Sequence, residues 1–164
     1  YRNFYWRMGI DPTKTRPSSE ALARRILRGQ SLPKINNVVD AYNLASVETL
    51  VSMGAYDDEK IDYPLTLRFA KPGEEFVGIG RGAEKLRGGE LVLADSSKII
   101  NVYPYRDSEH TKVAEDTQEV LLVVAGVPGL SNDLIYRATE KACRYITRFC
   151  GGTYSFQTIR VFKS

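Results

Sequence analysis

The sequence predicts a single domain of the α+β class, and three observations support this. Helical patterns come first, short strand-like runs fill the middle, and a long helical pattern follows. This segregation of helices and strands is typical of α+β domains. The length of 164 residues fits one domain spanning residues 1–164, and 43% hydrophobic and 26% charged residues exclude a disordered chain. Because the first residue is Tyr1, we expect the full protein to have further N-terminal residues.

Two helices are expected before the strands. The first covers residues 17–29, since Pro17 suits the first helical position and Gly29 suits a C-terminal stop. Spacings of three and four predict a buried stripe of Leu22, Ala23, Ile26 and Leu27 and leave Arg24, Arg25 and Arg28 on the opposite face. The second helix covers residues 37–53, with core residues Val39, Tyr42, Val47 and Leu50.

Five short strands are predicted next, because β-branched and aromatic runs alternate with turn residues. Their ranges are 65–70, 75–79, 90–94, 98–103 and 120–125. The run from Val120 to Val124 lacks polar alternation, which predicts burial on both faces. We therefore expect it to be a central strand of an antiparallel or mixed sheet.

A final helix is predicted over residues 132–149. Its apolar face contains Leu134, Ile135, Ala138, Ala142, Tyr145, Ile146 and Phe149. Its basic residues Arg137, Lys141, Arg144 and Arg148 share one direction, since they follow the spacing i, i+4, i+7 and i+11. A strand over residues 154–162 is expected to close the domain.

Positive charge is concentrated at the two ends of the chain. Residues 1–29 have seven Lys/Arg and two Asp/Glu, residues 30–130 have ten and sixteen, and residues 131–164 have six and two. The basic elements predict RNA binding through Arg24, Arg25, Arg28, Arg137, Lys141, Arg144 and Arg148. The alternative is a solvated face, because we expect no aromatic side chains between these basic ones.

Several classes of protein are disfavoured. No run reaches the roughly 18 apolar residues of a membrane span. Cys143, Cys150 and His110 are too few for a typical zinc site, so we expect no metal, and we expect no cofactor. The run from Gly78 to Ala83 matches a dinucleotide fingerprint, but no helix can follow it, which favours a glycine-rich turn. The free thiols indicate a reducing compartment, hence a cytoplasmic protein.

Two groups of polar residues are candidates for a site. Asn36, Asp40 and Asn43 share one helical line and could bind the ends of an amino acid, or equally brace the preceding loop. Glu109 and His110 lie close to Thr117 in sequence and could position a water for ester hydrolysis. The alternative for His110 is a surface residue.

Five segments resemble, in order, the B3/B4 domain of the phenylalanyl-tRNA synthetase beta subunit. They are INNVVDAYN (35–43), AYD (55–57), LVLAD (91–95), EHT (109–111) and TQEVLL (117–122). The preceding RPSSEAL (16–22) is similar to free-standing relatives of that domain. The resemblance implies a three-layer α+β domain with helices on an unusual β-sandwich. It also implies a pocket that, in synthetases, removes tyrosine wrongly attached to phenylalanine tRNA.

The chain departs from this family at two pocket positions. The synthetase pattern Pro-x-His-Ala-Phe-Asp has its histidine where this chain has Gly54, and the pattern Leu-Leu-Glu has its acid where this chain has Val123. The matched positions that stay polar give the catalytic candidates Glu109, His110 and Asn43. They also give the substrate-binding candidates Asn36, Asp40, Asn43 and Thr117.

These observations lead to alternative functional hypotheses. The first is a free-standing tRNA-binding domain that recognises the aminoacylated 3' end and deacylates misacylated tRNA in trans, without aminoacylation activity. The second is a non-enzymatic module that binds an amino acid or related small molecule, and RNA. A structural domain of a larger assembly is a third. The oligomeric state stays open.

Overall fold

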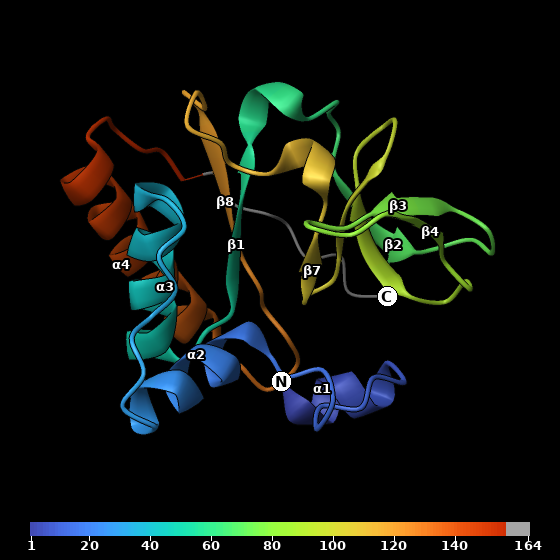
Figure 1. The fold of residues 1–164 in the computed structure, drawn as a ribbon, viewed down its shortest axis with the longest axis horizontal. Helices are drawn as coiled ribbons and strands as arrows, with labels where there is room; N and C mark the ends of the chain where they lie inside the picture. Colours follow the sequence, from blue (N-terminus) through green and yellow to red (C-terminus); the bar gives the residue numbers. More distant parts are fainter. Residues whose placement is uncertain (157–164) are drawn as a thin grey trace.

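A computed structural model describes residues 1–156, which form three layers (Figure 1). Helices α3 and α4 form one layer, a ribbon of β1 and β8 lies in the middle, and the remaining strands form the third layer. The helices are α1 (Arg2–Arg7), α2 (Ser18–Leu27), α3 (Asn37–Thr49) and α4 (Asn132–Cys150). The strands are β1 (Met53–Asp57), β2 (Thr66–Phe69), β3 (Glu75–Val77), β4 (Ala83–Lys85), β5 (Leu91–Ala94), β6 (Ile99–Val102), β7 (Arg106–Asp107) and β8 (Val120–Val124). The predicted α+β class is confirmed.

The central ribbon separates two apolar cores. Strand β1 pairs antiparallel with β8, and because side chains alternate along a strand, each face of the ribbon packs on a different layer. One face, with Met53 and Ala55, packs with α3 and α4, and we call this the helix-facing core. The other face, with Tyr56 and Val123, packs on Leu93 and Ile100 of the four-stranded sheet β2-β5-β6-β7, and we call this the sheet-facing core.

The end of α3 differs from the prediction. The helix was expected to run to residue 53, but it ends at Thr49, and Leu50 adopts a left-handed conformation with φ of 56°. This turn lets the chain enter β1, a strand that the sequence analysis missed. Leu50 was predicted in the core but is exposed. The sequence analysis extended the helix because Leu50 continues the apolar spacing of Val47, although Leu50 lies outside the core.

Strand β8 was predicted to be central in a sheet, but among the described residues it is not. Within residues 1–156 it pairs only with β1, in a two-stranded ribbon. The strand lacks polar alternation because both of its faces are buried, as predicted. Val120, Leu122 and Val124 pack on the helix-facing core, and Leu121 and Val123 pack on the sheet-facing core. The strand is covered on both faces, but by two different layers rather than within one sheet.

The apolar stripe predicted for α2 is only half right. Leu22 is buried, but Ile26 is 45% exposed and Leu27 is 85% exposed. Helix α2 lies at the edge of the domain (Figure 1), so its last turn extends beyond the core. On α4 the predicted apolar residues that pack in the helix-facing core are Leu134, Ala138, Ala142, Tyr145 and Ile146, whereas Phe149 is exposed.

The first residue closes one end of the ribbon. The backbone N–H of Ser52 donates to the Tyr1 hydroxyl (3.0 Å), which in turn donates to the carbonyl oxygen of Ala125 (2.6 Å). Ser52 precedes β1 and Ala125 follows β8, so a single side chain connects the backbones of the two strands where their ladder ends.

Two further findings concern the rest of the described chain. The predicted closing strand is absent from residues 154–156, and its remainder, residues 157–162, lies outside the described residues. The run from Gly78 to Gly82 forms the expected turn between β3 and β4, and Ala83 begins β4. In residues 1–156 none of the helices combines the length and apolarity needed to cross a bilayer.

Candidate functional site

A cluster of polar side chains lies at the sheet-facing side of the ribbon. The Tyr56 hydroxyl on β1 donates to Asp107 Oδ1 on β7 (2.7 Å), and the Asn101 side-chain amide on β6 donates to the same oxygen (2.9 Å). Asn101 also donates to the carbonyl oxygen of Arg106 (3.0 Å). We call Tyr56, Asn101 and Asp107 the Asp107 cluster. It brings together strands that are some fifty residues apart in sequence.

Burial shapes the acid–base properties of this cluster. Desolvation raises the pKa of the Asp107 carboxyl above its ordinary value, and the hydrogen bonds from Tyr56 and Asn101 only partly oppose this. Burial, and then the nearby Asp107 carboxylate, raise the pKa of Tyr56 well above its usual value. The carboxyl of Asp107 is therefore the group in the cluster that titrates most readily, and it does so at a higher pH than an exposed aspartate.

The two positions at which the chain differs from the family that it resembles lie opposite each other beside this cluster. Gly54 is directly opposite Val123 in the β1–β8 register, so position 54 and position 123 lie on the same face of the ribbon. A Cβ atom at position 54 would lie 3.2 Å from both Asp107 Oδ1 and the Tyr56 hydroxyl. Position 54 therefore faces the Asp107 cluster. Because glycine has no side chain, it leaves room there for the Asp107 carboxyl and the Tyr56 hydroxyl.

The polar residues Asn36 and Asp40 form hydrogen bonds at the start of α3, and the Asn36 amide also donates to the carbonyl oxygen of Val113 (3.5 Å). The Asn36 side chain caps α3 by accepting from the backbone N–H of Val39 (2.9 Å), and Asp40 accepts from the N–H of Ile35 (3.0 Å). These bonds fit the loop-bracing alternative. Asn43 is buried, and its side chain forms no hydrogen bond with residues 1–156.

The other predicted polar residues lie elsewhere. Glu109 forms an ion pair with Lys112, and Thr117 donates to Asp57 Oδ2 (2.8 Å) beside the end of β1. The exposed His110 lies on the turn after β7. Across the described part of the chain, no hydrogen bond or ion pair joins the α3 residues to Glu109, His110 or Thr117. The structure does not join the predicted residues in one network of hydrogen bonds and ion pairs.

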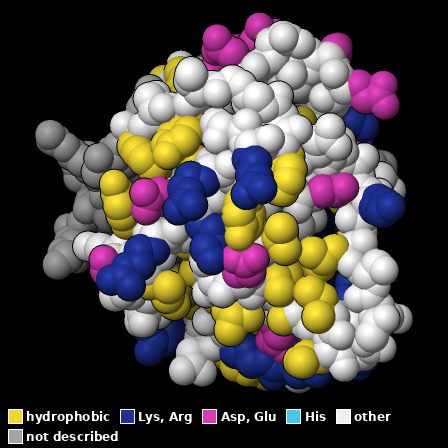
Figure 2. Space-filling model, turned by 90° about the vertical axis from the view of Figure 1, so that its left-hand side faces the viewer, with side chains coloured by type: hydrophobic (Ala, Val, Ile, Leu, Met, Phe, Trp, Pro, Cys, Tyr) yellow, Lys and Arg dark blue, Asp and Glu magenta, His cyan; other side chains and the backbone are white. Residues whose placement is uncertain are grey.

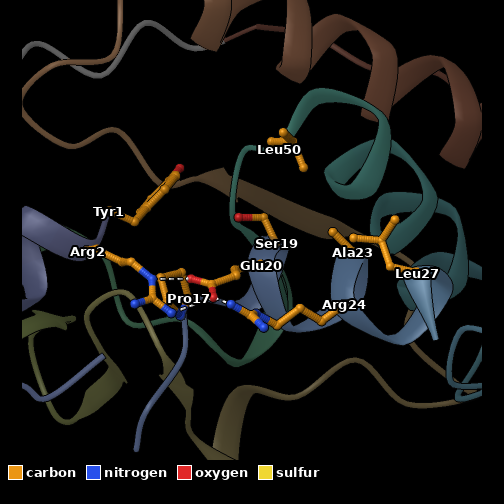
Figure 3. A pocket seen from close by; sticks show the side chains of 9 residues that line it. All are labelled: Tyr1, Arg2, Pro17, Ser19, Glu20, Ala23, Arg24, Leu27 and Leu50. Atoms are coloured by element: carbon orange, nitrogen blue, oxygen red, sulfur yellow. Dashed lines mark hydrogen bonds and ion pairs between the residues drawn. The ribbon is translucent and has the colours of Figure 1, made fainter. Parts of the chain in front are cut away.

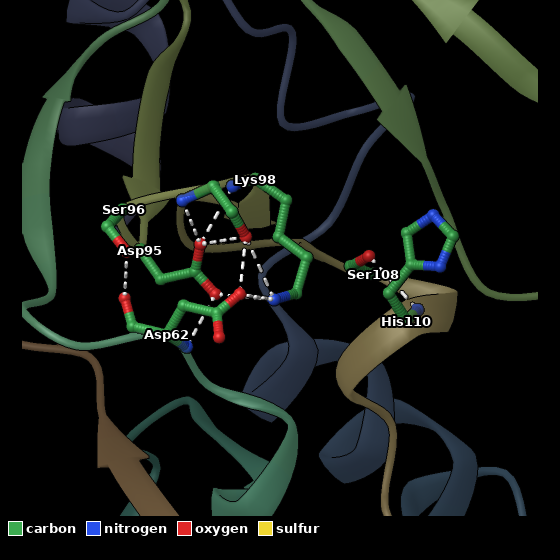
Figure 4. Close-up of polar contacts among 7 residues, drawn as sticks. Asp62, Asp95, Ser96, Lys98, Ser108 and His110 are labelled. Atoms are coloured by element: carbon green, nitrogen blue, oxygen red, sulfur yellow. Dashed lines mark hydrogen bonds and ion pairs between the residues drawn. The ribbon is translucent and has the colours of Figure 1, made fainter.

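His110 instead lines a polar hollow of about 420 Å³ at the edge of the four-stranded sheet (Figure 4). Lys98 lies there between Asp95 (2.8 Å) and Asp62 (3.0 Å). Burial alone would raise the pKa of Asp95, but hydrogen bonds from Lys98 and the backbone of Ser97 lower it to about 2. Lys98, Asp95 and Asp62 are thus paired with one another, and His110 lies apart from this group (Figure 4).

A second hollow, of about 500 Å³, is an open groove between the chain start, α2 and Leu50 (Figure 3). Glu20 accepts from Arg2 (2.7 and 2.9 Å) and from Arg24 (2.7 Å), and these hydrogen bonds lower its pKa to about 2. Ala23, Leu27 and Leu50 give this groove its apolar lining. Within residues 1–156, no group of three His, Cys, Asp or Glu side chains could hold a metal ion.

The predicted basic residues differ in how freely they present their charge. Arg24 pairs with Glu20, Arg137 with Asp133, and Lys141 with Glu48 (2.6–2.7 Å). Arg25 donates to the carbonyl oxygen of Ser31 (3.2 Å). Arg28, Arg144 and Arg148 are exposed and form no ion pair within the described residues. Figure 2 shows Lys and Arg side chains scattered among hydrophobic ones on the face that includes the helical layer.

Sequence reasoning missed the Asp107 cluster. Its three members are on separate strands, and none of the periodicities places them next to each other. One signal was available: Tyr56 stands where the resembling family has phenylalanine, so this chain adds a hydroxyl that a buried site must satisfy with a hydrogen bond.

Comparisons with known proteins agree with this fold. The model of the B3/4 domain family matches residues 1–151. The phenylalanine–tRNA ligase beta subunit of Fusobacterium nucleatum is 33% identical over 116 residues, covering 71% of this chain and 14% of that protein. The same subunit of Haemophilus ducreyi is 28% identical over 149 residues, covering 77% and 19%. The chain thus spans less than a fifth of these relatives.

A solved structure is also similar. It is an N-terminal fragment of the phenylalanyl-tRNA synthetase beta subunit from Pyrococcus horikoshii, with a TM-score of 0.56 and 17% identity. The match covers 72% of this chain and 42% of that fragment. At this identity the similarity shows the fold.

Proposed function

Because the chain belongs to the B3/4 domain family, we propose that it is an RNA-binding domain for tRNA, and that it binds without hydrolysing the aminoacyl ester. The relatives that it matches are tRNA ligase subunits. Exposed arginines on two helices provide charges that can neutralise phosphates. The partner we propose is a tRNA, and a cytoplasmic location follows from that partner.

We infer the absence of hydrolysis from the pairing of Gly54 with Val123. Ester hydrolysis needs a group that positions or deprotonates a water. The two facing positions hold a glycine and a valine, neither of which can do this. Tyr56 and Val123 are also nearly inaccessible to solvent, so packing fills much of the space next to position 54.

Binding and hydrolysis can be tested together. We expect the chain to bind unmodified tRNA transcripts in a fluorescence anisotropy titration, with an affinity that falls steeply as salt rises. We expect tRNA charged with a panel of amino acids to lose the amino acid no faster with the protein than in buffer. Absence of tRNA binding at low salt would contradict the first part, and accelerated deacylation would contradict the second.

Deacylation in trans is the second candidate, and the Asp107 carboxyl beside Gly54 favours it. A carboxylate there could hold a water against an activated ester, and positioning alone contributes much to such reactions. In this case Asp107→Asn abolishes deacylation and leaves tRNA affinity unchanged.

A small-molecule role, with a free amino acid as ligand, predicts instead that amino acids raise the melting temperature of the protein without tRNA.

A further inference from the structure

We propose that the outer face of α4, together with the segment that follows it, binds single-stranded RNA by stacking bases on exposed aromatic rings. This inference rests on the proposed RNA binding and names the surface and the form of RNA. Its parts are the rings of Tyr136, Tyr154 and Phe156 and the side chain of Arg144. We call these residues the aromatic face.

The chain turns back along α4 to form this face. Gly151 and Gly152 both have φ of 82°, a conformation that glycine adopts readily, and they follow the last residue of the helix. The Phe156 ring then lies 5.6 Å from that of Tyr136, which is in the second turn of α4. The Tyr154 ring lies 5.3 Å from the Phe156 ring, edge to face. Three rings thus gather beside one helix.

These rings stay accessible to a ligand. Tyr136 is 57% exposed, and Tyr154 and Phe156 are each more than 40% exposed. Aromatic groups of this size are usually buried, and contiguous exposed apolar groups mark interaction sites. The sequence analysis expected no aromatic side chains among the basic ones, and this expectation is wrong for α4. Phe149, assigned there to the core, is also 54% exposed.

Arginine side chains accompany the rings. Arg144 is exposed and lies about two helical turns after Tyr136 on α4. Arg137, next to Tyr136, pairs with Asp133 (2.7 Å), but both side chains are mostly exposed, so this pair costs little to separate.

This combination favours single-stranded RNA among polyanions. Proteins that bind single strands combine cationic side chains along the backbone with aromatic rings on which bases stack. A duplex keeps its bases stacked on each other and offers mainly phosphates to such a surface. An aromatic face with arginines therefore predicts a preference for unpaired bases, which every tRNA presents in its loops and at its 3' end.

The test uses the whole chain and fluorescein-labelled 12-nucleotide RNA, measured by anisotropy. We expect wild-type protein to bind oligo(U) more tightly than a blunt duplex of equal length. Phe156→Ala and Tyr136→Ala should each weaken oligo(U) binding by roughly fivefold or more, the effect of losing one stacked base. Phe69→Ala is the matched control, since Phe69 is equally exposed on β2, in the opposite layer (Figure 1).

The salt dependence separates stacking from charge. For the ring variants, the plot of log affinity against log salt should shift down with unchanged slope. For Arg144→Gln, the slope should fall by about 0.7, the value for one phosphate contact on a single strand. Circular dichroism verifies that each variant is folded, which the exposure of these side chains leads us to expect.

Two results would overturn the inference while leaving the proposed function intact. One is tRNA binding by wild-type protein with unchanged oligo(U) affinity in both ring variants. The other is equal affinity for oligo(U) and duplex. Failure of wild-type protein to bind any RNA at low salt would instead remove the proposed function, and this inference with it.

Discussion

The two faces of the β1–β8 ribbon show how one pair of strands serves two purposes. Toward the helices, Met53 and Ala55 join an apolar core in which Ala138 and Ala142 let α3 and α4 pack closely. Toward the sheet, Tyr56 and Asp107 form a hydrogen-bonded polar cluster next to Gly54. Since alternate residues of β1 belong to different faces, the sheet-facing side can change its chemistry while the helix-facing side keeps the fold.

The largest effect is expected on the helix-facing side. Met53→Ala should lower the free energy of unfolding by about 2–5 kcal/mol, because it removes a buried side chain and leaves a cavity. Urea denaturation followed by circular dichroism measures this. Leu67→Ala, at an exposed position of β2, is the control and should cost much less. Equal losses would show that the helix-facing core does not dominate stability.

On the sheet-facing side, Asp107→Ala should lower the free energy of unfolding by about 1–3 kcal/mol. The substitution leaves the Tyr56 hydroxyl without its acceptor. The Asn101 amide, in contrast, still donates to the carbonyl oxygen of Arg106. Because Tyr56→Phe removes the same hydrogen bond, the double variant should lose less than the sum of the two single losses. Additive losses would contradict the existence of a coupled cluster.

The same cluster predicts a pH dependence that the apolar side lacks. The pKa of Asp107 is raised in the folded protein, so folding favours its protonated form. The contribution of Asp107 to stability is therefore present in acid and is lost as pH rises from its ordinary pKa of 3.8 through the folded value. Asp107→Asn should abolish this loss, so the stability of the variant relative to wild type should increase over that range. A constant difference in unfolding free energy would argue against a raised pKa.

The smallest effect is expected at Gly54. In Gly54→Ala the new Cβ atom would lie 3.2 Å from Asp107 Oδ1 and the Tyr56 hydroxyl, so the cluster must shift, at a cost of about 1 kcal/mol. Gly82→Ala is the matched control, since a Cβ atom there meets nothing within 4 Å. Thermal unfolding compares the two. If Gly54→Ala is as stable as the Gly82 variant, the space beside Asp107 is not limited.

Much of the fold could be predicted from the sequence, because caps and periodicity are local signals. The strands around residues 66–69, 75–77, 91–94 and 99–102 were found from their composition, and α4 from its repeating apolar positions. Strand β1 was missed because its sequence MGAYD has no β-branched residue, whereas the equally buried β8 was found from its valines. The short β4 and β7 were missed because their composition carries no such signal, and pairing alone defines them.

The candidate site was harder to predict, for a physical reason. Asn36 and Asp40 were selected for their spacing on one helix, and that spacing does place them together, but as local caps. The Asp107 cluster depends instead on the register between strands, as in the pairing of Gly54 with Val123. The resemblance identified these two positions separately, and only the three-dimensional pairing reveals that they face each other.

The hydroxyl of Tyr1 has a practical consequence for anyone who alters position 1. Because it is hydrogen-bonded to the backbone just before β1 and just after β8, Tyr1→Phe would leave an N–H of Ser52 and a carbonyl of Ala125 to find new partners. We expect the ribbon to fray from this end in that variant. Substitutions at Tyr1 should therefore be checked for their effect on cooperative melting before any change in binding is attributed to them.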